Sequence, residues 1–333
     1  MDPLTQGGLG ASLAQSVSTK ASAKIAAIVG FLAGMAADLD FLIHSETDSL
    51  LFLEYHRQFT HSLVFIPIGA LIVAILMHLV VTRRKGIRFS LVYRFSLLGY
   101  ATHAFIDACT SYGTQLFWPF SDVRIAWNQV SIIDPLLTIP LLLLVLLATL
   151  KRRPLYARLG FAWVIAYLLI GLYQHQRAVS VTKVVAESRG HQVERYEVKP
   201  SFANLLLWKS IYEYNGYYYI DAIHVSTKTR IYPGLKIAKL NIERDIPWLD
   251  LSSQQAKDIE RFRWFSSDFL SLNRENPLQV VDMRYSMMPD EARALWGIEL
   301  NPQASRDTHV GYEMYSDARK FDAGRFIKML TGQ

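Results

Sequence analysis

Long apolar runs fill the first half of the chain, whereas apolar and polar positions alternate more evenly in the second half. Runs of near membrane length cover 25–43, 62–81, 91–109, 136–150 and 157–174. A helix crosses the bilayer core with about 20 residues, since it rises 1.5 Å per residue. The pattern therefore predicts an all-α polytopic membrane bundle of about five spans at 1–177, followed by a soluble α+β domain at 178–333.

A shorter helix is predicted before the first span. Asp2 precedes Pro3, the arrangement of an N-cap followed by a first helical proline, and the helix can continue to Val17. At roughly 15 residues it is short for a full span. Its glycines and alanines favour close packing between membrane helices. Lys20 and Lys24 then indicate an aqueous turn.

The second half contains the signals of an α+β domain. Two segments alternate as strands, a hairpin is predicted around an Asn-Gly turn, and one segment has helical periodicity. These elements are, in chain order, Val179–Val185, Gln192–Lys199, Tyr212–Tyr219 and 253–271. His191, His224 and His309 are isolated there, and we expect them to be surface or packing residues. The only cysteine, Cys109, excludes an intrachain disulfide and a four-thiolate metal site.

Loop charges predict how the bundle is oriented. The loops at 83–88 and 151–158 hold four Lys/Arg each, whereas those at 44–61 and 108–133 hold one each. By the positive-inside rule the first pair is cytoplasmic, so the domain that follows the last span is extracytoplasmic. The net charge of +6 is modest and concentrated in those loops. No nucleic-acid partner is expected.

With this orientation, the residue types that bind metals gather on the outer side of the membrane. They are Asp38, Asp40, His56, His61, His103, Asp107 and Asp134. Imidazole and carboxylate ligands without thiolates suit zinc, with manganese as the alternative, at one to three ions. Carboxylates at membrane depth are costly unless they are paired or bound to a metal. Hydrolysis by metal-activated water is the natural chemistry of such a set.

Several of these residues have a second interpretation. His103 and Asp107 share a helix face and form either a metal pair or a buried hydrogen bond; the convergence favours the metal. Asp38 and Asp40 either ligate, orient a histidine, or lie at a solvated helix end. Asp134 precedes a proline and is equally a ligand or an N-cap.

Two cations in the outer loops, and two polar residues of the N-terminal helix, have roles that stay open. Arg57 and Arg124 either hold an anionic substrate by charge-assisted hydrogen bonds or anchor their loops at the membrane interface, with equal weight. Asp2 is favoured as an N-cap. If the N-terminal helix dips into the membrane from the outer side, Asp2 and Gln6 join the cluster there.

These motifs resemble the YdjM-like group of bacterial inner-membrane proteins, whose members are described as metal-dependent hydrolases. The matching pieces are Met1-Asp2-Pro3-Leu4-Thr5-Gln6, Asp38-Leu39-Asp40, His56-Arg57-Gln58-Phe59-Thr60-His61-Ser62, His103–Asp107, Thr110–Phe120 and Ile133-Asp134-Pro135. The family is similar to zinc-dependent phospholipase C and single-strand nucleases, which implies phosphoester hydrolysis. Gln6 departs from the many relatives that carry histidine there. The resemblance covers roughly 1–140 and does not reach the C-terminal domain.

The sequence thus predicts a metal-dependent phosphoester hydrolase in the bacterial inner membrane, with a lipid or lipid-linked substrate. Its active site and C-terminal domain are expected on the extracytoplasmic side. Asp38, Asp107 and Arg57 are the expected catalytic residues. The main alternative is a non-enzymatic scaffold with a structural polar or metal cluster, whose C-terminal domain recruits a protein partner. A transporter ranks lowest, because the inner halves of the spans hold few polar residues besides His78 and Arg94.

Overall fold

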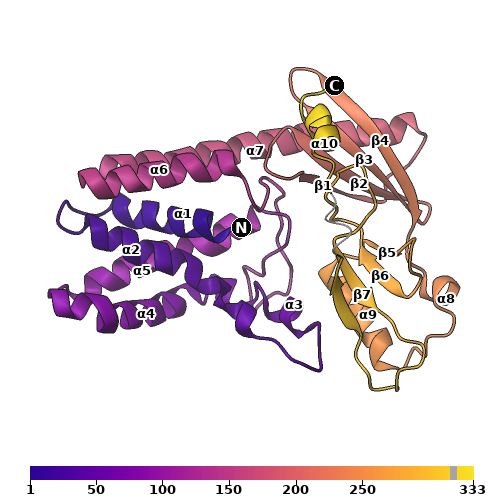
Figure 1. Cartoon of the computed structure of the whole chain (residues 1–333), viewed down its shortest axis with the longest axis horizontal. Helices are drawn as coiled ribbons and strands as arrows, with labels where there is room; N and C mark the ends of the chain where they lie inside the picture. Colours follow the sequence, from indigo (N-terminus) through magenta and orange to yellow (C-terminus); the bar gives the residue numbers. More distant parts are fainter. Residues whose placement is uncertain (316–320) are drawn as a thin grey trace. The chain divides into compact units, whose positions relative to one another are not determined.

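The computed structural model describes residues 1–315 and 321–333, which form two compact units (Figure 1). Unit 1 comprises Met1–Leu42, Tyr55–Tyr173 and Phe202–Asn204, and unit 2 comprises Ile43–Glu54, Gln174–Ser201 and Leu205–Gln333. The chain therefore leaves unit 1 at Leu42 and returns to it at Tyr55.

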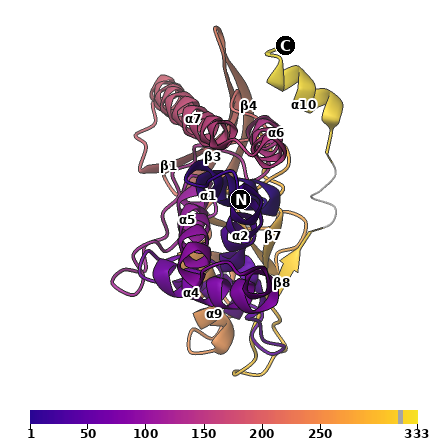
Figure 2. The same ribbon diagram turned by 90° about the vertical axis from the view of Figure 1, so that its left-hand side faces the viewer.

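Unit 1 is helical. Its helices are α1 (Pro3–Ser16), α2 (Ala23–Met35), α4 (Ile66–Met77), α5 (Phe89–Ala108), α6 (Pro135–Lys151) and the first part of α7 (Pro154–Ser188). Short turns extend two of them: η1 (Ala36–Leu42) follows α2, and η3 (His78–Thr82) and η4 (Arg83–Lys85) follow α4. A separate turn, η2 (Phe59–His61), precedes α4. Helix α1 packs on α2, α5 and α6, and α5 also packs on α2 and α4 (Figure 2).

Glycines allow three of these helices to touch through their backbones. A Cβ on Gly10 of α1 would lie 2.3 Å from the carbonyl oxygen of Gly30 on α2, and one on Gly99 of α5 would lie 2.5 Å from the same oxygen. Any larger residue at either position would push the helices apart. The contact fixes α2 against α5, and α5 carries two of the candidate ligands.

The prediction of about five membrane spans is wrong. Among the residues that the structure describes, three helical segments are long and apolar enough to cross a membrane: Ala23–Leu42, Ile66–Lys85 and Pro154–Ser188. Helix α5 has 20 residues, but Arg94, His103 and Asp107 lower its hydropathy. Helix α6 is apolar but has only 17 residues. The length of an apolar run alone was therefore not enough to identify α5 and α6 as membrane spans.

Of two local predictions, the N-cap of α1 is confirmed and a strand in the segment that follows unit 1 is not. Asp2 is the N-cap of α1, as predicted, and its carboxylate accepts a hydrogen bond from Thr5 N at 3.0 Å. The strand predicted at Val179–Val185 is wrong, because α7 continues to Ser188. Its buried positions recur at helical spacing, at Ala178, Val179, Thr182, Val185 and Ala186. Alternation over seven residues could not distinguish the two periods.

The described part of unit 2 contains two four-stranded antiparallel sheets, in the orders β1-β2-β3-β4 and β5-β6-β7-β8. The strands are Arg195–Pro200, Leu207–Tyr214, Tyr217–Val225, Thr229–Ala238, Leu270–Leu272, Gln279–Asp282, Trp296–Glu299 and Gly311–Met314. The helices are α3 (Leu51–Tyr55), α8 (Ile242–Asp245), α9 (Gln254–Phe265) and α10 (Ala323–Leu330). The α+β expectation is confirmed, and Asn215 and Gly216 form the predicted hairpin turn with φ of 49° and 70°.

The segment 43–54 is fixed within unit 2 by Arg261 of α9. Its guanidinium donates to Asp48 at 2.8 and 3.0 Å, to Glu54 at 2.5 Å and to Asp258 at 2.8 Å. The hydroxyl of Ser49 also donates to the carbonyl oxygen of Val310 at 2.7 Å. One arginine therefore pairs with three carboxylates and holds the segment that connects η1 to η2.

Replacing Arg261 should loosen this segment. In Arg261→Gln, three carboxylates lose their shared cation, and we expect amide hydrogen exchange across 43–54 to rise by about tenfold. Mass spectrometry of peptic fragments from the full-length protein measures this directly. Arg263→Gln is the matched control, because Arg263 lies on the same helix and pairs with Glu260 and Asp268. Equal exchange in both variants would contradict the assignment.

Two neighbouring lysines, one on β1 and one on β2, are buried. Lys199 and Lys209 are directly opposed in the strand register, and Lys209 Nζ donates to Ser286 Oγ at 2.7 Å and to the carbonyl oxygen of Glu291 at 2.8 Å. Burial lowers the pKa of Lys209 to about 7, although Asp290 opposes this effect. Burial and the neighbouring Arg284 lower the pKa of Lys199 in the same direction.

This arrangement predicts that stability rises with pH. Between pH 7 and about 10.4 the unfolded chain binds more protons at Lys209 than the folded chain does, so the free energy of unfolding increases across this window. Thermal unfolding of the full-length protein, followed by tryptophan fluorescence, should show the increase. Lys209→Met should flatten it in part, since Lys199 still contributes. An unchanged slope in the variant would refute the role of Lys209.

Candidate metal centre

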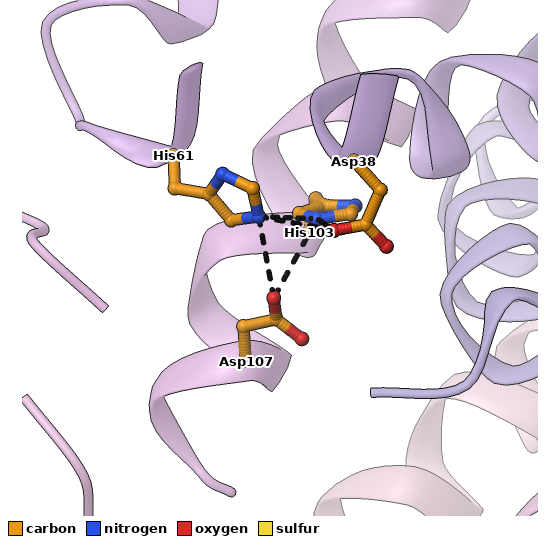
Figure 3. Close-up of side chains that lie close together, drawn as sticks. All are labelled: Asp38, His61, His103 and Asp107. Atoms are coloured by element: carbon orange, nitrogen blue, oxygen red, sulfur yellow. Dashed lines mark hydrogen bonds and ion pairs between the residues drawn. The ribbon is translucent and has the colours of Figure 1, made fainter. Parts of the chain in front are cut away.

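Four side chains from three segments of unit 1 point at one another (Figure 3). They are Asp38 from η1, His61 from η2, and His103 and Asp107 from α5. His61 Nε2 lies 2.8 Å from His103 Nε2 and 3.3 Å from both Asp38 Oδ1 and Asp107 Oδ2. His103 Nε2 lies 3.3 Å from Asp38 Oδ1 and 3.6 Å from Asp107 Oδ2. We call these residues the four-ligand cluster.

The cluster is enclosed on all sides but one. His61, His103 and Asp107 are fully buried, whereas the side chain of Asp38 is 27% exposed. Water or a ligand can therefore approach the cluster at Asp38.

Hydrogen bonds at the far side of each imidazole leave both Nε2 atoms as acceptors. His103 Nδ1 lies 2.6 Å from the carbonyl oxygen of Gly34, which can only accept. His61 Nδ1 lies 3.2 Å from a carboxylate oxygen of Asp40 and 3.0 Å from Thr60 Oγ1. With the proton on Nδ1 in both rings, the two Nε2 lone pairs face each other. At 2.8 Å the two nitrogens repel unless a proton or a metal ion lies between them.

The distances suit a tetrahedral metal ion. Metal–ligand bonds of about 2.0–2.2 Å place the corners of a tetrahedron about 3.3–3.6 Å apart. Four of the five separations given above fall at 3.3–3.6 Å, and the fifth is 2.8 Å. The cluster therefore has both the donor atoms and the spacing that a zinc-like ion requires.

The cluster also holds a buried carboxylate oxygen with unused accepting capacity. Asp107 Oδ2 accepts no hydrogen bond from the residues that the structure describes. Its partner Oδ1 is held by the amino group of Met1 at 2.6 Å and by the Gln6 amide at 3.1 Å. Arg57 Nε lies 3.2 Å from Oδ2 as an ion pair. A buried carboxylate oxygen oriented in this way is a ready metal ligand.

The carboxylates around His61 also favour a positive charge in the cluster. Burial alone would lower the pKa of His61, but the carboxylates of Asp107, Asp38 and Asp40 together raise it to about 10. Without a metal His61 therefore carries an extra proton at Nε2, and a divalent cation bound there would take the place of that proton.

Asp40 lies behind the cluster and orients both histidines of the HRQFTHS motif. Its Oδ2 accepts from Arg57 N at 2.9 Å and from Thr60 Oγ1 at 2.8 Å, and its Oδ1 lies 2.8 Å from His56 Nδ1. Asp38, Asp40 and His56 form a second group whose ligand atoms lie within 4.8 Å of one another. The two groups share Asp38.

Among the described residues, Asp134 belongs to neither of the two ligand groups. Asp134 is the N-cap of α6, where it accepts from Leu136 N at 3.1 Å and from the Tyr167 hydroxyl at 2.7 Å. Arg124 is equally occupied elsewhere, since it donates to the carbonyl oxygens of Tyr112 and Gly113. Arg57 is 4% exposed and donates to Thr110 Oγ1 at 3.1 Å.

Sequence reasoning missed the groups that orient the ligands. The carbonyl oxygen of Gly34 has no sequence signature, because its role depends on the contact between α2 and α5. The amino group of Met1 could have been anticipated, since Asp2 caps α1 at the end where the ligands gather. Gln6, whose role was left open, lies 3.3 Å from His103 Nε2 and 3.1 Å from Asp107 Oδ1.

Comparisons with known proteins cover the helical part of the chain. A family model described as "YdjM inner membrane protein" matches residues 1–178, which include every member of both ligand groups. An uncharacterized protein of Bacillus subtilis (strain 168), YfhP, is 27% identical over 115 residues, or 34% of each chain. The similarity thus spans about a third of that relative's length. No solved structure matches.

Metal analysis tests the cluster. Full-length protein purified without chelator should contain at least about one equivalent of zinc or manganese, and His103→Ala should lose about one equivalent. His191→Ala is the control, because its ring is outside both groups. Inductively coupled plasma mass spectrometry gives the stoichiometry. A folded, metal-free wild type would refute the metal centre.

Proposed function

The chain belongs to the YdjM inner membrane protein family, and on that premise we propose that it is a membrane-bound metal-dependent hydrolase of phosphoesters. The observation that carries the proposal is the convergence of two imidazole nitrogens and two carboxylate oxygens at 2.8–3.6 Å in a buried site. Asp38, His61, His103 and Asp107 would hold the ion. Zinc suits the nitrogen and oxygen donors best, and manganese is the alternative.

A divalent ion bound there supplies Lewis-acid chemistry and makes water nucleophilic near neutral pH. The residues of the chain then have distinct tasks. Asp40 and Gly34 fix the tautomers of His61 and His103. Asp38 is the one ligand of this cluster with an exposed side chain, so we assign it to accept the proton of the attacking water.

Arg57 has a positioning role in this proposal. Its guanidinium is buried between Asp107, Thr110 and the ring of Tyr112, whose centroid lies 4.8 Å away. From there it holds Asp107 in place and adds positive charge beside the site. An anionic phosphoester benefits from that charge without direct contact.

Apolar surface beside the opening supports a lipid or lipid-linked substrate. Leu39, Phe41 and Leu42 are exposed on the same turn as Asp38. The neighbouring loop adds Phe120, which is 85% exposed, and this loop is joined to the start of α4 by the hydrogen bond from Leu63 N to the Leu116 carbonyl oxygen at 2.9 Å. An amphiphile could keep its chains in the bilayer while its head group reaches Asp38.

We further propose that the site faces the extracytoplasmic side. Asp38 and Asp40 lie at the end of one candidate span, Ala23–Leu42, whereas Arg83, Arg84 and Lys85 lie at the end of another, Ile66–Lys85. Basic residues favour the cytoplasmic side. Several crossings of the inner membrane and an extracytoplasmic unit 2 follow from this orientation.

One observation favours a second candidate, a non-enzymatic protein with a structural metal. Four protein ligands around one ion are typical of structural zinc sites, whereas catalytic sites usually keep a position open. In that case unit 2 would recruit a protein partner, and the metal would only brace the helices.

Hydrolysis assays separate the two candidates. We expect the purified protein in lipid vesicles to cleave phospholipid or a chromogenic phosphodiester, to lose activity in chelator, and to regain it with zinc or manganese. Asp107→Asn should lower the rate by more than about 100-fold. Asp122→Asn, in an exposed loop, is the control. A folded, metal-loaded wild type that hydrolyses neither phosphomonoesters nor phosphodiesters would support the scaffold instead.

A further inference from the structure

We propose that Asp38, Asp40 and His56 form a second cation position, so that the site is a dinuclear centre in which Asp38 is shared. This inference rests on the proposed function, because it assumes an ion in the four-ligand cluster. It assigns the open, substrate-facing position to the second group.

The three residues present donor atoms to one another at ligand spacing. His56 Nδ1 lies 2.8 Å from Asp40 Oδ1, and one atom from each of the three residues lies within 4.8 Å of the others. The group contains an imidazole and two carboxylates, the donor types that zinc and manganese accept.

The two oxygens of Asp40 have different partners, and this suits a metal ligand. Oδ2 takes two hydrogen bonds, from Arg57 N and Thr60 Oγ1, and lies 3.2 Å from His61 Nδ1. This oxygen holds the carboxylate in one orientation. Oδ1 points the other way, to His56. A carboxylate fixed through one oxygen keeps the other in one orientation, and a cation bound there would replace the proton shared by Oδ1 and His56 Nδ1.

Asp38 connects the two positions. Its Oδ1 lies 3.3 Å from both His61 Nε2 and His103 Nε2, and the residue is also a member of the second group. A carboxylate has two oxygens and several lone pairs, so it can serve two cations at once. Shared carboxylates bring two ions close enough to act on one phosphoester.

Exposure distinguishes the two positions. Three of the four members of the four-ligand cluster are fully buried. The second group has only three protein ligands, and the side chains of Asp38 and His56 are 27% and 22% exposed. Three protein ligands with an open side are the arrangement of catalytic metal sites. The second position is therefore where water and a phosphoester can reach a cation.

The ring of His56 is held in place for this role. It packs edge-on against Tyr112, with centroids 5.6 Å apart, and against His61 at 6.0 Å. Arg57, the next residue, has φ of +65°, a left-handed backbone that its N–H bond to Asp40 stabilises. This bend sets His56 and His61 on either side of Asp40.

Metal counting on the full-length protein tests the inference. After equilibration with zinc and removal of free metal, the wild type should hold about two ions per chain and His56→Ala about one. His44→Ala is the matched control and should keep about two, because His44 is in neither group. His56→Gln serves as a second variant, and circular dichroism checks that each variant is folded.

A spectroscopic measurement tests whether Asp38 is shared. With manganese in place of zinc, the wild type should give the multiline electron paramagnetic resonance signal of two coupled ions, and His56→Ala the signal of an isolated ion. One ion per chain in the wild type would overturn the second position and leave the proposed function standing. No ion would overturn both. Two uncoupled manganese ions would overturn the sharing of Asp38.

Discussion

Two imidazole nitrogens that face each other at 2.8 Å are the constraint on which the rest of unit 1 depends. Neither ring can turn away, because His103 Nδ1 is held by the Gly34 carbonyl oxygen and His61 Nδ1 lies against Asp40 and Thr60. The carbonyl oxygen reaches His103 only because glycines let α2 approach α5 at backbone distance. The geometry of the ligands therefore depends directly on how closely α2 packs against α5.

The cost of burying this much charge explains the surrounding hydrogen bonds. Asp40 and Asp107 are almost completely buried, and an unpaired carboxylate in such a place costs several kcal/mol. Each is consequently surrounded by donors: Asp40 by Arg57 N and Thr60, and Asp107 by Met1 N, Gln6 and the Arg57 guanidinium. Arg57 contributes to both, its backbone to one carboxylate and its side chain to the other. The HRQFTHS motif thus supplies ligands and their supports together.

Local chemistry was predictable from the sequence, and long-range packing was not. The Asp2 cap and the Asn215-Gly216 turn follow from rules that involve neighbouring residues. The structure also brings together Asp38, Asp40, His56, His61, His103 and Asp107, which loop charges had placed on one side. The error in span number arose at α5 and α6, because α5 was counted as an apolar run although it carries Arg94, His103 and Asp107, and α6 has only 17 residues. The sequence cannot show that Asp134 meets Tyr167 rather than the histidines, since that depends on how α6 lies against α7.

The segment that separates the candidate ligands along the chain does not fold with them. Asp38 and Asp40 precede the segment 43–54, and His56 and His61 follow it, so the ligand set is divided by a stretch that folds with unit 2. Arg261 fixes this stretch through three carboxylates. A loop closed at both ends costs less entropy to order when its middle is already held. Holding residues 43–54 within unit 2 therefore leaves fewer residues to be ordered between Asp40 and His56.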